Sequence, residues 1–142
     1  MRTRTFTTRS EEETVALGAE LAREWAPPCC VLLIGNLGAG KTTLAKGVAE
    51  GLGAARAEEI SSPTFALIHE HGDGLLYHVD LYRLETEEEV ASLGLEEILA
   101  KQAVVVMEWA ERFPGLLPEE RIEIRIEAQG DETRRIEVTE LP

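Results

Sequence analysis

The segment from Val31 to Leu52, VLLIGNLGAGKTTLAKGVAEGL, constrains the fold more than any other part of this sequence. It begins inside the apolar run CCVLLI, residues 29–34, continues through a glycine-rich stretch and ends in a helix-forming run. A short, continuous apolar run is typical of a strand that is buried on both faces. We therefore expect a buried strand over residues 29–34, a glycine-rich loop, and a helix from Lys41 to about Leu52.

The glycine-rich stretch matches the pattern G-x-x-x-x-G-K-[ST] over residues 35–42. Between a buried strand and a helix, this pattern predicts a P-loop, whose backbone N–H groups wrap a phosphate at the positive end of the helix. Lys41 is expected to reach the β- and γ-phosphates, and the Thr42 hydroxyl is expected to ligate Mg²⁺. The predicted phosphate-binding residues are Gly38, Ala39, Gly40, Lys41, Thr42 and Thr43.

Two acidic residues close apolar runs: LLYHVD ends at Asp80, and VVVMEW carries Glu108 next to its end. A nucleoside triphosphatase needs such acids at the carboxyl edge of its sheet to orient Mg²⁺ and the attacking water. Common P-loop enzymes use Asp in this second motif, so Glu108 departs from the usual pattern. The alternative is that each acid merely begins a solvated loop. We predict that Lys41, Asp80 and Glu108 are catalytic and that Thr42 and Glu108 bind the metal.

Polar residues near these acids allow more than one interpretation. Thr64, in SSPTF, is a candidate nucleotide-sensing switch that binds Mg²⁺ or the γ-phosphate, or it belongs to an ordinary turn before a strand. His78 lies two residues before Asp80 and either tunes that acid or packs in the core. His69 and His71 share a strand face, but no third ligand accompanies them, so we expect no metal site there.

The rest of the chain predicts an α/β fold, a P-loop NTPase-like sandwich over residues 1–142 as one domain. Its central sheet is expected to be largely parallel, with antiparallel hairpins at the edges. In the first half we expect a short edge strand in RTRTFTT, a helix capped by Ser10 and stopped by prolines 27 and 28, and a hairpin turning at residues 72–74. In the second half we expect one broken or two short helices over 86–100, a buried strand over 103–109 and a hairpin over 121–141.

The charge balance restricts the partners. Asp and Glu outnumber Lys and Arg by 27 to 14, which gives a formal net charge of −13. Nucleic-acid binding usually needs a basic patch, so unaided RNA or DNA binding is not expected, and a docking protein with a basic face suits this surface. No apolar run is long enough to span a bilayer, and the adjacent Cys29 and Cys30 suit a reducing compartment. The expected location is the cytoplasm.

Four segments together carry a specific resemblance: GNLGAGKTTLAKG, SSPTF, YHVDLYRL and VVVMEW. In this combination the chain resembles the bacterial TsaE family, the small ATPase of tRNA threonylcarbamoyladenosine (t⁶A) biosynthesis. The resemblance implies that ATP and Mg²⁺ bind through Lys41, Thr42 and Glu108, that Asp80 assists there, and that Trp109 lies close to the nucleotide. Ser10 and Arg134 are candidates to border the base or ribose.

The resemblance also implies partners, the TsaB and TsaD proteins, which transfer the threonylcarbamoyl group to adenosine 37 of tRNA. In that family TsaE hydrolyses ATP to sustain turnover of the complex and meets tRNA only through these partners. No residue is identified with certainty as an arginine finger, although Arg83 is a candidate in cis. We therefore expect slow ATP hydrolysis by the isolated chain. The alternatives are a small-molecule kinase and a scaffold that binds nucleotide without hydrolysing it. No N-K-x-D run indicates a preference for guanine.

Overall fold

A seven-stranded sheet forms the centre of the protein in the computed structural model, which describes residues 1–36, 38–61 and 67–142. The strands are β1 (Arg2–Thr8), β2 (Cys29–Ile34), β3 (Ile68–His71), β4 (Leu76–Asp80), β5 (Val104–Glu108), β6 (Arg121–Ala128) and β7 (Arg134–Leu141). The helices are α1 (Glu11–Arg23), α2 (Lys41–Leu52), α3 (Glu87–Ala91) and α4 (Leu95–Leu99), with short 3₁₀ turns η1 (Ala57–Glu59), η2 (Ala110–Arg112) and η3 (Pro114–Leu116).

The strand order is β1-β7-β6-β2-β5-β4-β3. Strands β6, β2, β5 and β4 are parallel to one another, whereas β1 with β7, β7 with β6, and β3 with β4 pair antiparallel. The predicted α/β class, with a largely parallel centre and antiparallel edge hairpins, is therefore confirmed. The sequence pattern did not predict the strand order, in which β2 lies between β5 and the C-terminal hairpin of β6 and β7.

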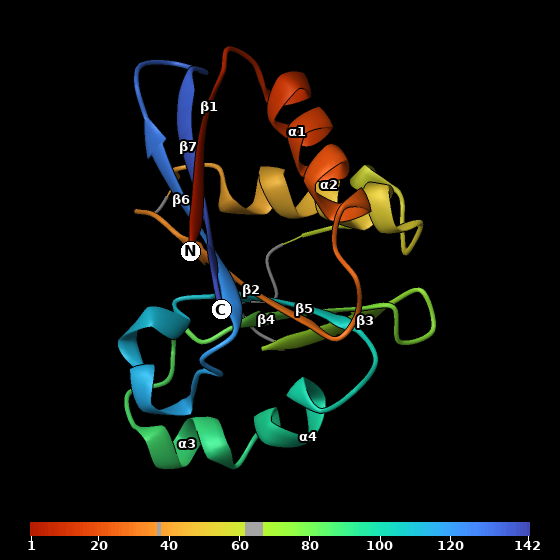
Figure 1. Ribbon diagram of the computed structural model, residues 1–142, viewed down its shortest axis with the longest axis vertical. Helices are drawn as coiled ribbons and strands as arrows, with labels where there is room; N and C mark the ends of the chain where they lie inside the picture. The colour runs from red at the N-terminus through yellow and green to blue at the C-terminus, as the bar shows by residue number, and fades with distance from the viewer. Residues whose placement is uncertain (37, 62–66) are drawn as a thin grey trace.

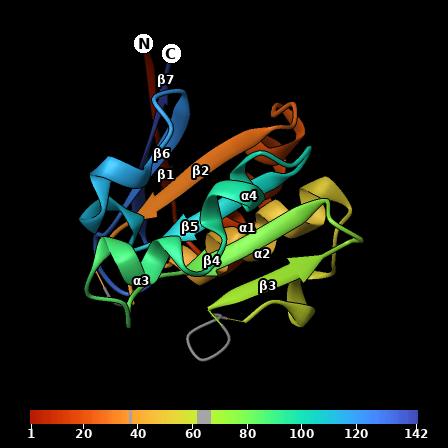
Figure 2. The same ribbon diagram turned by 90° about the horizontal axis from the view of Figure 1, so that it is seen from below.

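Helices cover both faces of the sheet centre, α1 and α2 on one face and α3 and α4 on the other (Figures 1 and 2). In β2, Val31 and Leu33 belong to the core beneath α1 and α2, while Leu32 belongs to the core beneath α3 and α4. This double burial explains the uninterrupted apolar run of β2. Strand β6 instead alternates buried and more exposed residues, because only one of its faces is covered.

Glycines bring α1 and α2 into backbone contact. A Cβ atom at Gly47 would lie 2.0 Å from the carbonyl oxygen of Val15, and one at Gly18 would lie 2.5 Å from that of Leu44. Both distances are shorter than real Cβ contacts, so only glycine permits this approach. The contact fixes the first turn of α2, and with it the glycine-rich loop, against α1.

Capping residues set the helix boundaries. The Ser10 hydroxyl accepts a hydrogen bond from the Glu13 N–H at 3.1 Å and begins α1, which ends at Arg23, before the two prolines. Thr86 and Glu89 form the predicted capping box at the start of α3. Gly94, in a left-handed conformation, separates α3 from α4, so the segment forms two short helices. Among the described residues, no helix combines the length and apolar character that crossing a membrane requires.

Candidate functional site

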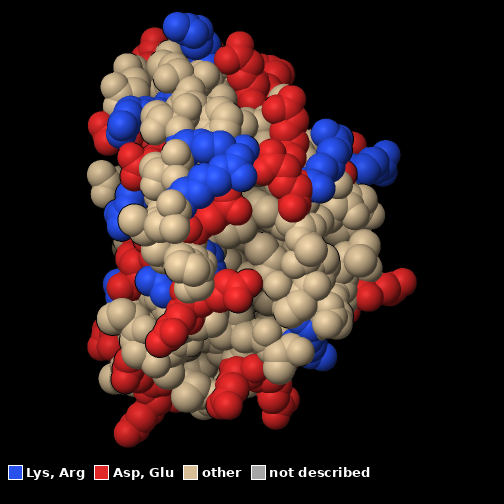
Figure 3. Space-filling view, in the orientation of Figure 1, with Lys and Arg blue, Asp and Glu red and all other residues tan. Residues whose placement is uncertain are grey.

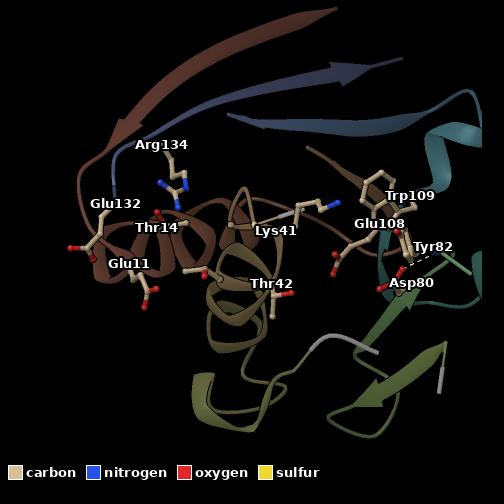
Figure 4. Close-up of a pocket in the computed structure, with 13 residues that line it drawn as sticks. Glu11, Thr14, Lys41, Thr42, Asp80, Tyr82, Glu108, Trp109, Glu132 and Arg134 are labelled. Atoms are coloured by element: carbon tan, nitrogen blue, oxygen red, sulfur yellow. Dashed lines mark hydrogen bonds between the residues drawn. The ribbon is translucent and has the colours of Figure 1, made fainter. Parts of the chain in front are cut away.

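A cavity of about 410 Å³ opens at the carboxyl ends of β4 and β5, beside the first turn of α2 (Figure 4). The described residues that line it are Glu11, Thr14, Gly38, Gly40, Lys41, Thr42, Thr43, Asp80, Tyr82, Glu108, Trp109, Glu132 and Arg134. Parallel strands end at the same edge of a sheet, which brings residues far apart in the sequence to one place.

The glycine-rich loop, residues 35–42, turns into α2 through left-handed glycines. Gly38 has φ of 79° and Gly40 has φ of 110°, values that other residues rarely adopt. Of the predicted phosphate-binding residues, Gly38, Gly40, Lys41, Thr42 and Thr43 line the cavity. Ala39 is not among the lining residues, because its side chain is buried in the core beneath α1 and α2.

Lys41 is held inside the cavity wall with only 5% of its surface exposed. Its ammonium Nζ donates a hydrogen bond to the Gly35 carbonyl at 2.8 Å and lies 3.6 Å from the centre of the Trp109 ring. Burial lowers the pKa of Lys41, while the negative charges of Glu108, Glu111 and Asp80 act in the opposite direction. The Lys41 side chain is thus fixed beside the N-terminus of α2.

The two predicted acids lie next to each other. Asp80 and Glu108 are register partners on the neighbouring parallel strands β4 and β5, and each is 3% exposed. The Tyr82 N–H donates to Asp80 Oδ1 at 2.9 Å, and His78 Nε2 lies 2.6 Å from Glu108 Oε2. The sequence left open whether His78 tunes Asp80 or packs, and the structure joins it to Glu108.

Aromatic side chains close the cavity beside Lys41. Trp109, directly after β5, has a positive φ of 66°, and its ring lies 5.1 Å from that of Tyr82. The family resemblance implied Trp109 near the nucleotide, and Tyr82 was not predicted. The signal for Tyr82 was its position two residues after Asp80, the last residue of β4.

The opposite end of the cavity comes from the start of α1 and the β6–β7 connection (Figure 4). Arg134, a candidate to border the base or ribose, lines this end, and its Nε donates to the Ala39 carbonyl at 2.7 Å. Glu11, Thr14 and Glu132 were not predicted, since no local pattern marks them.

Three other predictions have different outcomes. Ser10 was expected beside the base or ribose, but it caps α1 and is not among the described residues that line the cavity. Arg83, the candidate arginine finger, does not line it either. Thr64 lies outside the described residues, so its switch role stays a prediction.

Comparison with known proteins identifies the family. The model of the family "Threonylcarbamoyl adenosine biosynthesis protein TsaE" matches residues 8–136. The chain belongs to the TsaE family.

Individual relatives within the TsaE family agree over nearly the whole chain. A "tRNA threonylcarbamoyladenosine biosynthesis protein TsaE" of Bacillus subtilis is 47% identical over 135 residues, which cover 93% of this chain and 82% of the relative. The protein of the same description from Treponema pallidum is 40% identical over 131 residues, which cover 92% of this chain and 96% of the relative. The crystal structure of Bacillus YdiB superposes with a TM-score of 0.80 at 38% identity, covering 99% of this chain and 87% of that one.

The donor atoms of this TsaE-family site fit a magnesium ion that is shared with a phosphate. Thr42, Asp80 and Glu108 offer hydroxyl and carboxylate oxygens, the hard ligands that Mg²⁺ prefers. Within residues 1–36, 38–61 and 67–142, no group of three or more His, Cys, Asp or Glu could hold a metal by itself. Mg²⁺ commonly uses one or two carboxylates and completes its shell with substrate phosphates and water.

Proposed function

We propose that this TsaE-family chain binds ATP with Mg²⁺ and hydrolyses it, and that hydrolysis supports threonylcarbamoyl transfer to adenosine 37 of tRNA by the TsaB and TsaD proteins. One observation carries the proposal: Lys41, Asp80 and Glu108 meet in a single cavity at a glycine-rich loop. Its volume, about 410 Å³, lies within the range of small-molecule sites.

Each side chain has a role that follows from its position. The N–H groups near residues 38–43 surround the phosphates, and Lys41 neutralises the charge that develops as the γ-phosphoryl group transfers. Thr42 and Glu108 would hold the Mg²⁺, which would supply further charge neutralisation when bound. Asp80 or Glu108 orients the attacking water. Trp109 borders the nucleotide.

The surface charge supports contact with tRNA through partners. In Figure 3, basic side chains form small groups that acidic side chains border, and acidic side chains occupy much of the remaining edge. The net charge of −13 would repel a phosphate backbone. A protein complex with a basic face fits this surface better, and the cytoplasm is the compartment where such a complex meets tRNA.

A phosphate-release assay tests the proposal. ATP and GTP are each supplied with Mg²⁺ to the chain alone, then with TsaB and TsaD, and then with tRNA added. We expect slow release from ATP by the chain alone and faster release with the partners. Equal rates with and without partners would contradict the partner dependence.

Product analysis separates the alternatives. A phosphorylated small molecule in place of free phosphate would establish a kinase. ATP binding without hydrolysis in any mixture would establish a scaffold.

A further inference from the structure

His78 contacts Glu108 from the interior of the protein. Its Nε2 atom lies 2.6 Å from Glu108 Oε2, and the two side chains are 1% and 4% exposed. Glu108 lines the cavity, whereas His78 is absent from the described lining residues. The imidazole therefore reaches the carboxylate from behind, where it does not compete with a ligand for space.

Hydrogen bonding determines where the imidazole carries its proton. His78 Nδ1 is buried and has no hydrogen-bond partner among the described residues. A proton on Nδ1 would be a buried donor without an acceptor, which costs more than an unpaired lone pair. A proton on Nε2 can be donated to Oε2 of Glu108, 2.6 Å away. The tautomer with its proton on Nε2 is thus the one that these surroundings favour.

The hydrogen bond also fixes the direction of the carboxylate. Oε2 of Glu108 is engaged by His78, and no hydrogen bond among the described residues engages Oε1. Asp80, the register partner of Glu108, also accepts a hydrogen bond, from the Tyr82 N–H to its Oδ1. A carboxylate that a buried donor holds in one orientation presents its second oxygen without first losing rotational freedom.

We propose that His78 is a positioning residue, which holds Glu108 through the Nε2–H bond so that the other oxygen, Oε1, faces the cavity. The proposal rests on the proposed function, because it assigns Glu108 to the Mg²⁺ and water of that site. His78 itself touches neither nucleotide nor metal.

The proton position is tested first, on the nucleotide-free protein. The chain has three histidines, so ¹⁵N–¹H spectra of the imidazoles can be assigned with His69→Gln and His71→Gln variants. We expect His78 to carry its proton on Nε2, and we expect Glu108→Gln to shift that signal. A proton on Nδ1 would overturn the proposal whatever the protein does with ATP.

The role in positioning is tested through the metal requirement. Affinity for ATP is measured by calorimetry with and without Mg²⁺, alongside the Mg²⁺ concentration for half-maximal phosphate release. His78→Phe should raise that concentration about 10–100-fold and leave the metal-free affinity unchanged. His78→Gln should recover part of the loss, since its amide can donate. His69→Gln, at the register partner of His78 on β3, is the matched control and should behave as wild type.

The outcomes separate this proposal from the proposed function. If wild type binds no ATP with Mg²⁺, both are overturned. If wild type binds and His78→Phe keeps the same Mg²⁺ requirement, only the role of His78 is overturned. Thermal unfolding verifies that each variant is folded. Should His78→Phe fail to fold, His78→Asn replaces it, because its shorter side chain does not reach Oε2.

Discussion

The two ends of the cavity differ in how deeply their charged residues are buried. At one end Lys41, Asp80 and Glu108 are at most 5% exposed and stand at a helix start and two strand ends. At the other end Glu11 and Glu132 are exposed and stand at the start of α1 and in the β6–β7 connection. The buried end therefore has fixed charges in a low dielectric, while water and salt screen the charges of the open end.

This difference in burial gives the charged residues of the two ends different energetic roles. A fixed, poorly solvated charge acts strongly on a neighbouring phosphate or metal, because no solvent must reorganise around it. An exposed carboxylate adjusts its position at little cost and contributes little energy. We therefore expect ATP hydrolysis to depend on the residues of the buried end and to tolerate substitutions at the open end. Four measurements test this comparison of the two ends.

The largest effect is expected for Lys41→Ala. Removal of the ammonium should lower ATP hydrolysis by about 10²–10³-fold, because no other lysine lines the described cavity. Lys46→Ala, on the same helix and outside the lining residues, is the matched control and should keep the wild-type rate. Phosphate release with and without the partner proteins measures both. Equal losses in the two variants would show that the effect does not depend on a position in the cavity.

The same chemical change at each end gives the sharpest comparison. Glu108→Gln should reduce hydrolysis by about 10²-fold with ATP binding retained, since the isosteric amide loses the charge that serves metal and water. Glu132→Gln, at the open end, should change the rate by about twofold or less, because solvent screens that charge. Calorimetry and phosphate release on both variants measure the pair. A larger loss in Glu132→Gln would reverse our assignment.

The α1–α2 contact sets the separation of the two ends, since α2 carries Lys41 and α1 carries Glu11. Gly47→Ala would place a methyl group 2.0 Å from the Val15 carbonyl oxygen. We expect the free energy of unfolding to fall by about 1–3 kcal/mol.

A matched glycine tests that expectation by urea unfolding. In Gly115→Ala the new methyl group meets only the flexible end of the Glu87 side chain, at 2.8 Å. Its stability should stay within about 0.5 kcal/mol of wild type. Similar losses in both glycine variants would show that the helix contact is not the cause.

The smallest effect concerns the pH dependence of stability. Burial lowers the pKa of Lys41 from the ordinary value of 10.5, so the folded state releases this proton before the unfolded state does. As the pH rises through the folded pKa toward 10.5, the stability of wild type should increase relative to Lys41→Met. Urea unfolding of the nucleotide-free proteins over this alkaline range measures the difference. A decrease would mean that the nearby acids outweigh burial.

The contrast between the buried and the open end of the cavity also explains which site residues could be predicted from the sequence. Strand β2 and helix α2 have the predicted bounds, and the two hairpins form where turn residues predicted them. The buried end of the cavity followed from local patterns, because a strand end and a loop motif are read from consecutive residues. Lys41, Asp80 and Glu108 were found in this way.

Local patterns did not mark the open end, where Arg134 alone of the described lining residues was expected, on the family resemblance. The hydrogen bond from Arg134 to Ala39 joins residues 95 positions apart, and packing alone brings Glu11 and Glu132 beside them. The order of the strands and the contact of His78 with Glu108 likewise depend on which strands become neighbours. Composition and periodicity carry no information about these distant pairings.

The position of the first strand has a consequence for biosynthesis. Strand β1 is at the edge of the sheet and pairs with β7, which begins at Arg134, 126 residues after β1 ends at Thr8. At about 5–20 residues per second, translation of this interval takes roughly 6–25 s. During this time β1 cannot pair with β7, so this edge of the sheet forms only after the ribosome has delivered β7.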